Sequence, residues 1–476
     1  MRIRPRLRQT GAALVSALVV VAGGSSTAWS QSLVEAMAAA YNSNPDLLAG
    51  RALLRQTDET LQQALSNWRP KVTLSAELNK IEADSVPVSR SAAYFILNGK
   101  TTLLSVTQPI FRGGKTVADT KVAQANIQAQ RASLANTEET VLLQAVTAYA
   151  NLVQDLGIVD VRRNNVRVLV QQLDATRERF RVGELTITDV SQAEARLEQA
   201  KADLVLAEAQ IRIDEAVYVH VIGQKPGKMG ELPLFGALPA SEEEAVSLAM
   251  NSGPLPVSAQ YRISAASYGV NSATAALLPQ VNLIGYIQQQ FDLSVPTDAY
   301  NQYGVRLQAT VPIYQNGSEW SQIRQAKELV GQRRNELDSA RRTAAENVIR
   351  AWRNLDSARS RVNSFTAQVK ANGVALNGVR QEALVGSRTT LDVLNAEQEL
   401  LNSQVSLITA RHDVQVAFYT VLSGIGRLTA RTLGLPVEFY DEEKYYKEVG
   451  SRWIGLWNQS PSSTQSGVTQ TGGTQQ

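Results

Sequence analysis

The chain of 476 residues contains no cysteine, only two histidines, and aromatic residues at a level of 6%. The absence of cysteine excludes a disulfide framework, a zinc–thiolate cluster and thiol chemistry. Neither His220 nor His412 is accompanied by a recognisable set of metal ligands or by a Ser-His-Asp arrangement. We therefore expect a protein that is not an enzyme and that needs no cofactor and no metal.

Long hydrophobic runs are also absent after residue 30, because no later segment approaches the 18 consecutive apolar residues of a membrane-spanning helix. The first 30 residues differ: Arg2 to Arg8 hold four arginines, residues 12–22 are apolar, and small residues follow. This order is typical of a secretion signal. We expect cleavage near Ser30/Gln31 and export of the remainder; the alternative is an uncleaved amphipathic anchor.

The net charge of +3 comes from the same segment. Without its four arginines, 43 basic residues face 44 acidic ones. The basic balance therefore gives no indication of a nucleic-acid partner.

From residue 31 onward the chain contains two copies of one unit, a pattern to be sought before local structure. Thr107–Gly114 (TQPIFRGG) matches Thr310–Gly317 (TVPIYQNG) at an offset of 203 residues, and Pro70–Leu74 matches Pro279–Leu283 at an offset of 209. The six-residue difference indicates a surface loop of variable length between these points. The predicted domains are a signal peptide at 1–30, a first repeat at 31–226, a linker at 227–240, a second repeat at 241–428, a C-terminal equatorial segment at 429–457 and a disordered tail at 458–476, rich in Ser, Gln, Thr and Gly.

Each copy contains two segments in which apolar and polar residues alternate. From Val72 to Leu78, and again from Tyr303 to Val311, every second residue is apolar or small. Strands of a soluble sandwich would alternate in the same way, but the remainder of each copy offers no further strands to complete one. Segments of about ten residues are long enough to cross a bilayer when tilted. We predict membrane strands at about 71–84, 97–108, 280–292 and 302–313.

Between the strands lie helical segments that are too long for a globular core. Lys115–Arg181 contains no proline and corresponds to about 100 Å of helix, and Thr186–Ile222 follows it. The second copy repeats this at Ser318–Leu384 and from Thr389 to about Leu422. Large apolar residues recur every seven positions from Val190, with alanines between them, which predicts close antiparallel coiled-coil packing.

Four strands cannot close a barrel, for which about eight is the practical minimum. An open sheet edge in lipid would leave backbone groups unsatisfied at several kcal/mol each. The chain must therefore associate with copies of itself if it spans a membrane. The helices would follow the same symmetry and form a second, longer cylinder, and the polar inner faces would make the assembly a water-filled conduit.

The repeated VGxxTxxDV pattern, the strand pairs and the helix lengths resemble the TolC-like outer-membrane factor family. The resemblance extends from about Gln31 to Leu428, and Tyr445–Leu456 is similar to C-terminal segments of type I secretion members. It implies a mainly α protein, a coiled-coil α-barrel continuing into a 12-stranded transmembrane β-barrel, built by a homotrimer in outer-membrane lipid. It also implies a passive exit duct for efflux or type I secretion, opened at its periplasmic tip by a periplasmic adaptor and an inner-membrane transporter.

The same resemblance places the pore constriction just after the second VGxxT turn. Asp392 and Asn395 are three residues apart and share one helix face. Turned to the lumen, Asp392 would form an acidic ring that selects cations. Asn395 stands where the family often has a second aspartate, so we expect a weaker ring. Asp392 also fits a capping carboxylate at a helix start, which is the alternative.

Gate links and docking turns follow from the resemblance as well. Arg388 matches the family's linking arginine, and Thr188 and Asp189 match its partners. Ala383 replaces a tyrosine of the family, so we expect an easier-opening or differently latched gate. Gly183 and Gly386 permit the tight turns at the tips, where the adaptor would dock. The competing interpretation of the whole chain is a periplasmic coiled-coil structural or adaptor protein without a membrane barrel.

Overall fold

The computed structural model describes residues 30–455 except 86–92, 231–232, 292–298 and 451. The predicted tail at 458–476 and all but the last residue of the predicted signal peptide lie outside the described residues. Ser30 itself begins β1 (Ser30–Gln31), which pairs in parallel with β4 (Lys228–Met229).

Two very long helices dominate the described chain, and both have 67 residues. Their bounds agree with the prediction made from the sequence. Among the described residues, no helix combines the length and the apolar character that crossing a membrane would need. The helical elements are α1 (Leu33–Ser43), α2 (Pro45–Ser66), α3 (Lys115–Arg181), α4 (Ile187–Ile222), α5 (Glu242–Ser252), α6 (Pro254–Thr274), the 3-10 turn η1 (Ala275–Leu277), α7 (Ser318–Leu384), α8 (Thr390–Gly424) and α9 (Lys444–Gly450).

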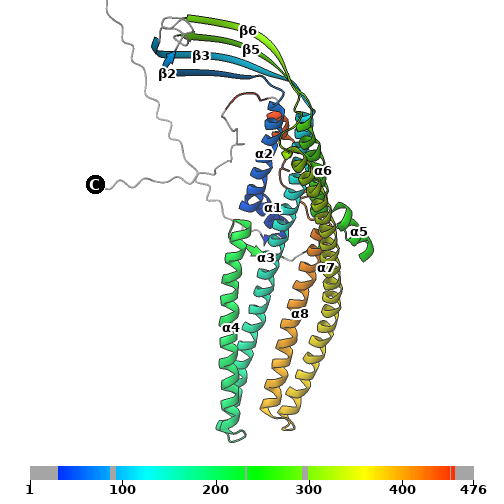
Figure 1. The fold of residues 1–476 in the computed structure, drawn as a ribbon. Coiled ribbons are helices and arrows are strands. Elements are labelled where there is room, and N and C mark those ends of the chain that lie inside the picture. The colour runs from blue at the N-terminus through cyan, green and yellow to red at the C-terminus, as the bar shows by residue number, and fades with distance from the viewer. Residues whose placement is uncertain (1–29, 86–92, 231–232, 292–298, 451, 456–476) are drawn as a thin grey trace, which may run out of the picture.

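The long helices lie side by side in the order α4, α3, α8, α7, and they form two antiparallel hairpins (Figure 1). Helix α6 packs on α3 and α7, while α1 and α2 pack on α3. The main hydrophobic core lies where these helices meet, and its largest fully buried side chains include Tyr149, Tyr218 and Tyr419. The core is therefore at the middle of the rod, and the two hairpins extend beyond it toward their tips.

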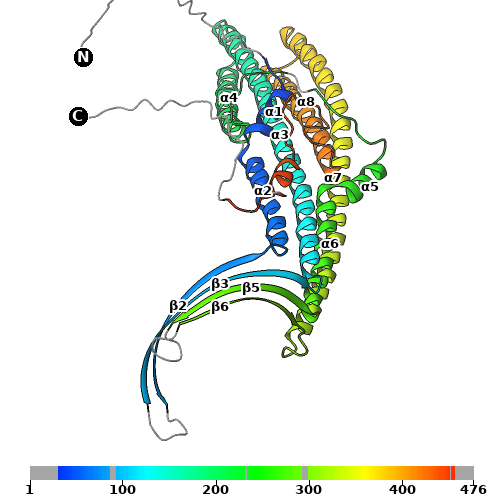
Figure 2. The same cartoon turned by 90° about the horizontal axis from the view of Figure 1, so that it is seen from above.

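A single curved antiparallel sheet lies at the opposite end of the molecule, in the strand order β2-β3-β5-β6 (Figures 1 and 2). Its four strands lie at the predicted places, although β3 is longer at both ends and β6 runs from Ala299 to Thr310 instead of 302–313. Strand β3 joins the two repeats by pairing with β5. The bounds are β2 (Lys71–Ser85), β3 (Ala93–Arg112), β5 (Gln280–Phe291) and β6 (Ala299–Thr310).

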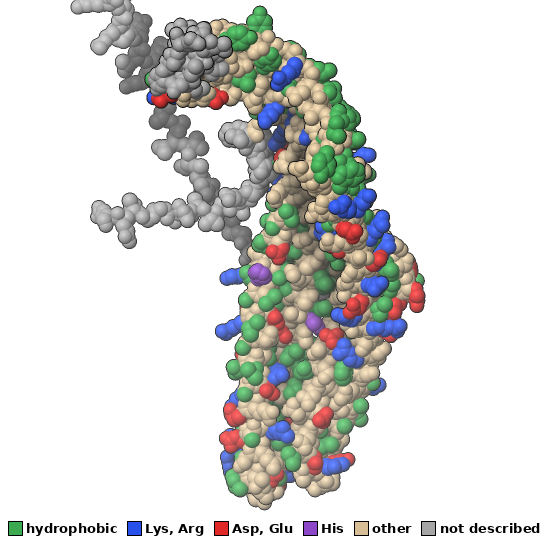
Figure 3. All heavy atoms as spheres, viewed as in Figure 1, with side chains coloured by type: hydrophobic (Ala, Val, Ile, Leu, Met, Phe, Trp, Pro, Cys, Tyr) green, Lys and Arg blue, Asp and Glu red, His purple; other side chains and the backbone are tan. Residues whose placement is uncertain are grey.

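The register sorts the sheet into an apolar face and a polar face. One row across the four strands is apolar throughout: Leu74, Leu104, Ile287 and Tyr303. These side chains are open to the outside, and Tyr303 is 83% exposed. The neighbouring row, whose side chains point to the opposite face, begins with Thr73 and Ser105, whose hydroxyl oxygens are 2.7 Å apart. Hydrophobic side chains gather over the outer side of the sheet in Figure 3.

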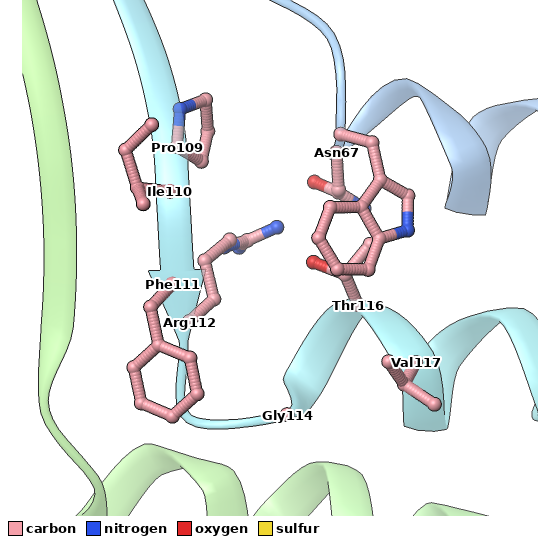
Figure 4. Close-up of a pocket in the computed structure, with 9 residues that line it drawn as sticks. Asn67, Pro109, Ile110, Phe111, Arg112, Gly114, Thr116 and Val117 are labelled. Atoms are coloured by element: carbon pink, nitrogen blue, oxygen red, sulfur yellow. The ribbon is translucent and has the colours of Figure 1, made fainter.

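Glycines make the junction between sheet and helices. Gly114 and Gly317 stand immediately before α3 and α7 with φ of 81° and 80°, a backbone that favours glycine. They are 203 residues apart, so both repeats turn from strand to helix in the same way. At the first junction Arg112 on β3 points toward Asn67 and the start of α3 across a small pocket, which Phe111 also lines (Figure 4).

Candidate pore constriction and gate

Both hairpins end in a short turn at the end of the molecule remote from the sheet (Figure 1). Gly183 lies between α3 and α4 with φ of 82°, and Gly386 lies between α7 and α8 with φ of 81°. At both positions the added Cβ of another residue would meet open space, so backbone conformation alone accounts for the glycine. The two predicted tip turns are therefore present, and they have the same geometry.

Each turn is followed by the same helix cap. The backbone N–H of Thr186 donates to Asp189 Oδ2 at 3.0 Å, and the N–H of Asp189 donates to Thr186 Oγ1 at 3.3 Å. In the second hairpin the N–H of Thr389 donates to Asp392 Oδ2 at 2.9 Å, and the N–H of Asp392 donates to Thr389 Oγ1 at 3.2 Å. This reciprocal pair is a capping box with aspartate in place of glutamate.

The hydrogen bonds of the cap favour the ionised form of Asp392. The hydrogen bond from the backbone of Thr389 and that from its hydroxyl lower the pKa of Asp392 below its ordinary value. The carboxylate is therefore charged at neutral pH. The capping role of Asp392 is confirmed. Only Oδ2 takes part in the cap. The position of Asp392 in a lumen stays a prediction, because a lumen needs further copies of the chain.

Asn395 connects the two hairpins. Its Oδ1 accepts a hydrogen bond of 3.2 Å from Nη2 of Arg196, so α4 and α8 are joined near their tips. Next to Asn395, Leu394 on α8 is buried in an apolar cluster with residues of α3 and α4. The other buried members of this cluster are Leu169, Leu173, Val190, Ala193, Leu197 and Ala200. The predicted constriction residue thus lies beside an apolar contact between the hairpins.

The predicted gate residues are placed differently. Arg388 Nε donates to Glu382 Oε2 at 2.8 Å, so its partner lies in its own hairpin, and this bond raises the pKa of Arg388. Within the described residues, Arg388 is bonded to neither Thr188 nor Asp189. Thr188 is exposed, and the Asp189 carboxylate is engaged in its cap. A link from Arg388 to these two residues within one chain is therefore absent from the described structure.

Sequence reasoning missed one pair of contacts, although the repeat contains a signal for it. Arg177 pairs with Glu194 at 3.4 Å in the first hairpin, and Arg380 pairs with Glu397 at 2.8 Å in the second. Arg177 corresponds to Arg380, and Glu194 to Glu397, at the common offset of 203 residues. The first pair is half exposed, whereas the side chain of Glu397 is only 5% exposed.

Comparisons with known proteins agree with this geometry. Residues 36–224 and 246–427 match the model of the family described as outer membrane efflux protein. The chain is 36% identical to the outer membrane efflux protein BepC of Brucella suis, over 93% of this chain and 96% of the relative. It is 25% identical to the outer membrane protein TolC of Escherichia coli, over 87% and 86%. Its fold is similar to the crystal structure of the Campylobacter jejuni CmeC outer membrane channel, with a TM-score of 0.74, 17% identity, and coverage of 88% and 89%.

The resemblance to the TolC-like family is thereby confirmed, and the two matched segments cover most of both repeats. These similar proteins are an outer membrane efflux protein, an outer membrane protein and an outer membrane channel. With its two repeats, its curved sheet and its paired helical hairpins, the chain belongs to the outer membrane efflux protein family.

Proposed function

We propose that three copies of this chain form a passive exit duct that begins at the periplasmic tips of the hairpins and ends in the outer membrane. The observation that carries the proposal is the four-stranded sheet, which has one apolar and one polar face and stands on helices of 67 residues. An apolar outer face suits lipid, and a polar inner face suits a water-filled lumen. Location in the outer membrane accords with the family to which the chain belongs.

The open edge of the helical layer supports assembly with further copies. On α4, Val205, Leu206 and Ile213 are 64%, 68% and 56% exposed. Their counterparts in the second repeat are Ile408, Thr409 and Val416 on α8, which are half-buried between neighbouring helices. An apolar stripe of this kind on a soluble part of a protein indicates a contact surface. In a closed trimer, the α4 edge of one copy would meet the outer helices of the next.

The tips suit docking of a periplasmic adaptor and, through it, an inner-membrane transporter. Val182 and Val385 flank the two glycine turns, and they are 72% and 80% exposed. Leu384 is 75% exposed beside them. These apolar side chains lie at the remote end of the rod, where partner proteins can reach them in the periplasm.

The gate is proposed to lie at the same end. In a trimer, Asp392 would give an acidic ring at the constriction, with Asn395 on the same face, and the ring would favour cations. Arg388 would exchange its half-exposed partner Glu382 for Thr188 and Asp189 of a neighbouring helix pair in the closed state. An exposed ion pair such as Arg388–Glu382 contributes little to stability, so this exchange costs little.

The experiment is single-channel recording in planar bilayers with wild type, Arg388→Ser and the control Arg181→Ser. Arg181 pairs with Glu178 in the first hairpin at 3.0 Å and is more exposed than Arg388. We expect Arg388→Ser to raise the conductance of the closed channel and Arg181→Ser to leave it unchanged. Equal conductance of wild type and Arg388→Ser would overturn the latch assignment.

A periplasmic coiled-coil protein without a barrel is the competing function, and the family match does not favour it. Fractionation separates the two. An exit duct remains in the outer membrane until detergent extracts it as a heat-resistant oligomer. Recovery of the entire chain from the periplasm without detergent would overturn the proposed function.

A further inference from the structure

The sheet has two open edges in the described chain. Strands β2 and β6 each pair on one side only, with β3 and β5 respectively (Figure 2). Closing the sheet into a barrel requires β6 of one copy to pair with β2 of the next. The following inference rests on the proposed function, and it concerns the register of that seam.

The internal repeat relates the strand pairing of the first copy to that of the second copy. Leu74 pairs with Leu104 in the first repeat. Adding the offsets of 209 and 203 gives Leu283 and Leu307, and these two residues do pair in the second repeat. The offsets therefore reproduce a register that the structure shows independently. The same operation can be applied to the pairing that joins the repeats.

Strands β3 and β5 form that joining pair, with Gln108 opposite Leu283. At the offset of 203, Gln108 corresponds to Val311, which follows β6. At the offset of 209, Leu283 corresponds to Leu74 on β2. We propose that β6 pairs antiparallel with β2 of the next copy in the register that places Val311 opposite Leu74. It follows that Leu307 lies opposite the next copy's Leu78.

The faces of the sheet agree with this register. Leu78 and Leu307 both belong to the apolar face, and they are 80% and 68% exposed in the single chain. On the polar face, Gln308 falls opposite the next copy's Glu77. A slip by one residue would place Leu307 beside Glu77 or Asn79, and Val311 beside Thr73 or Ser75, so that alternative is disfavoured.

The end of β6 gives a second, independent observation. Strand β3 continues to Arg112 because β5 pairs with it along that stretch (Figure 4). The corresponding point on the β6 side is Gln315, yet β6 ends at Thr310. The β3–β5 pair has a bulge between Pro109 and Phe111. With the same bulge in the seam, residues 311–315 are the positions that would pair with 71–74 of the next copy.

Exposure in this stretch supports the same conclusion. Ile313 is 95% exposed, whereas its counterpart Ile110 is 51% exposed. Tyr314 is 76% exposed, whereas its counterpart Phe111 is 48% exposed. In one chain, this segment after β6 therefore lacks a strand partner, whereas the equivalent end of β3 has β5 as its partner.

The register also assigns an ion pair across the seam. Arg306 falls opposite the next copy's Asn79, which makes the next copy's Glu77 its diagonal neighbour on the polar face. Diagonal neighbours are about 7–8 Å apart at Cα, within reach of long side chains. Within the described residues Arg306 lies over the Tyr286 ring at 5.9 Å, and neither Arg306 nor Glu77 has an ion-pair partner. The seam joins these two charges around the lumen.

Disulfide formation tests the register, and the wild-type chain has no cysteine to interfere. Leu78→Cys with Leu307→Cys and Glu77→Cys with Gln308→Cys are the two matched pairs, one from each hydrogen-bonding class of an antiparallel ladder. Directly opposite residues lie about 4.5–5.5 Å apart at Cα, which suits a disulfide. Leu78→Cys with Val305→Cys, and Leu78→Cys with Ala309→Cys, are controls shifted by two residues in either direction.

We expect covalent dimers and trimers on non-reducing gels from a matched pair and far less from both controls. A control that links more efficiently than both matched pairs would overturn the register, as would failure of all four pairs in a protein that still runs as a heat-resistant oligomer. If no oligomer forms in the outer membrane for the cysteine-free chain, the proposed function fails instead. The two failures are thus distinguishable.

Charge reversal tests the ion pair in the full-length oligomer. Glu77→Arg and Arg306→Glu should each lower the temperature at which the oligomer dissociates in detergent, and the double variant should recover most of the loss. Lys100→Glu, on the apolar face of β3, combined with Arg306→Glu is the control that should give no recovery. Additive losses in the Glu77→Arg, Arg306→Glu double variant would overturn the pairing.

Discussion

The two helical hairpins have first helices of the same length, and the same turns and caps, yet they differ at equivalent positions in their interiors. Asp155 on α3 and Asp214 on α4 correspond to Ala358 and Ala417 in the second hairpin, at the common offset of 203. Asp214 contributes to the raised pKa of Asp155 across the first hairpin. The repeat therefore preserves the backbone while one hairpin contains a carboxyl pair where the other contains methyl groups.

The position of each hairpin in the layer explains a second difference. Helix α8 lies between α3 and α7, whereas α4 borders the open edge of the described chain (Figure 1). The equivalent carboxylates Glu194 and Glu397 consequently differ in exposure, at 55% and 5% of the side chain. A duplicated sequence thus gives interactions of unequal strength, because burial rather than residue type sets their energies.

The largest expected effect is at Leu394, the side chain of α8 that is buried against the first hairpin. Leu394→Ala should cost about 3 kcal/mol of local stability, since a buried leucine is removed and a cavity remains. The measurement is amide hydrogen exchange along α8 in the full-length protein. Exchange should accelerate by roughly two orders of magnitude near the tip, following the equivalence of 1.4 kcal/mol to a factor of ten.

Ser191 is the matched control, because it is the counterpart of Leu394 in the first repeat and is exposed. Ser191→Ala should change exchange near the tips by less than about 0.5 kcal/mol, as is usual for a surface substitution. Similar effects of the two substitutions would show that Leu394 does not hold the hairpins together.

The second prediction concerns the duplicated ion pair. Arg380→Gln leaves the Glu397 carboxylate buried without its partner, and should cost about 2 kcal/mol. Arg177→Gln removes the half-exposed counterpart and should cost no more than about 1 kcal/mol. Thermal unfolding of the detergent-solubilised protein, followed by circular dichroism, compares them. Equal losses would contradict the role given to burial, and an Arg380→Met, Glu397→Leu variant should recover stability.

Much of the fold could be predicted from the sequence, because it depends on periodicity and on local signals. The alternation around Val72 and Tyr303 defines the strands, and the absence of proline from Lys115 to Arg181 permits a helix of that length. Gly183 and Gly386 are read from the repeated VG pattern. These features are properties of short stretches, so no knowledge of distant contacts is needed.

The site was less accessible to the same reasoning. The bond between Arg196 and Asn395 joins residues 199 positions apart, and no local pattern relates them. The choice of Glu382 by Arg388 depends on the conformation of an exposed side chain. The resemblance to a family supplied Thr188 and Asp189 as partners of Arg388. In the proposed trimer such partners could come from a neighbouring copy, and a single chain does not show those contacts.

The third prediction uses the carboxyl pair of the first hairpin. Burial, and then the hydrogen bond to Asp214, raise the pKa of Asp155 to about 7. Since this folded-state pKa exceeds the unfolded value of 3.8, the stabilisation is fully present below about pH 4 and is lost as pH rises through 7. Amides of α3 around Asp155 should therefore be better protected at pH 5 than at pH 8, after correction for intrinsic exchange.

Asp155→Ala with Asp214→Ala reproduces the alanines of the second hairpin and should remove this pH dependence. Asp160→Ala is the control, because the Asp160 side chain is 82% exposed. The second hairpin should show no such dependence around Ala358 in the wild-type protein. If protection around Ala358 varies with pH as strongly as that around Asp155, the carboxyl pair is not its cause.

The smallest expected effect is at the caps, where the two hairpins should behave alike. Thr186→Ala and Thr389→Ala should each cost about 1 kcal/mol at the first turn of the following helix, measured by amide exchange in α4 and α8.

The caps also have a pH dependence. The hydrogen bonds to Thr186 and Thr389 lower the pKa values of Asp189 and Asp392. The contribution of the carboxylates to stability is therefore present above the unfolded pKa of 3.8, and it disappears only as pH falls through the lower folded pKa values. Both caps should therefore persist at pH 5. A cap at Thr389 that proved much stronger than the one at Thr186 would mean that assembly adds contacts to Asp392, as a ring at the constriction requires.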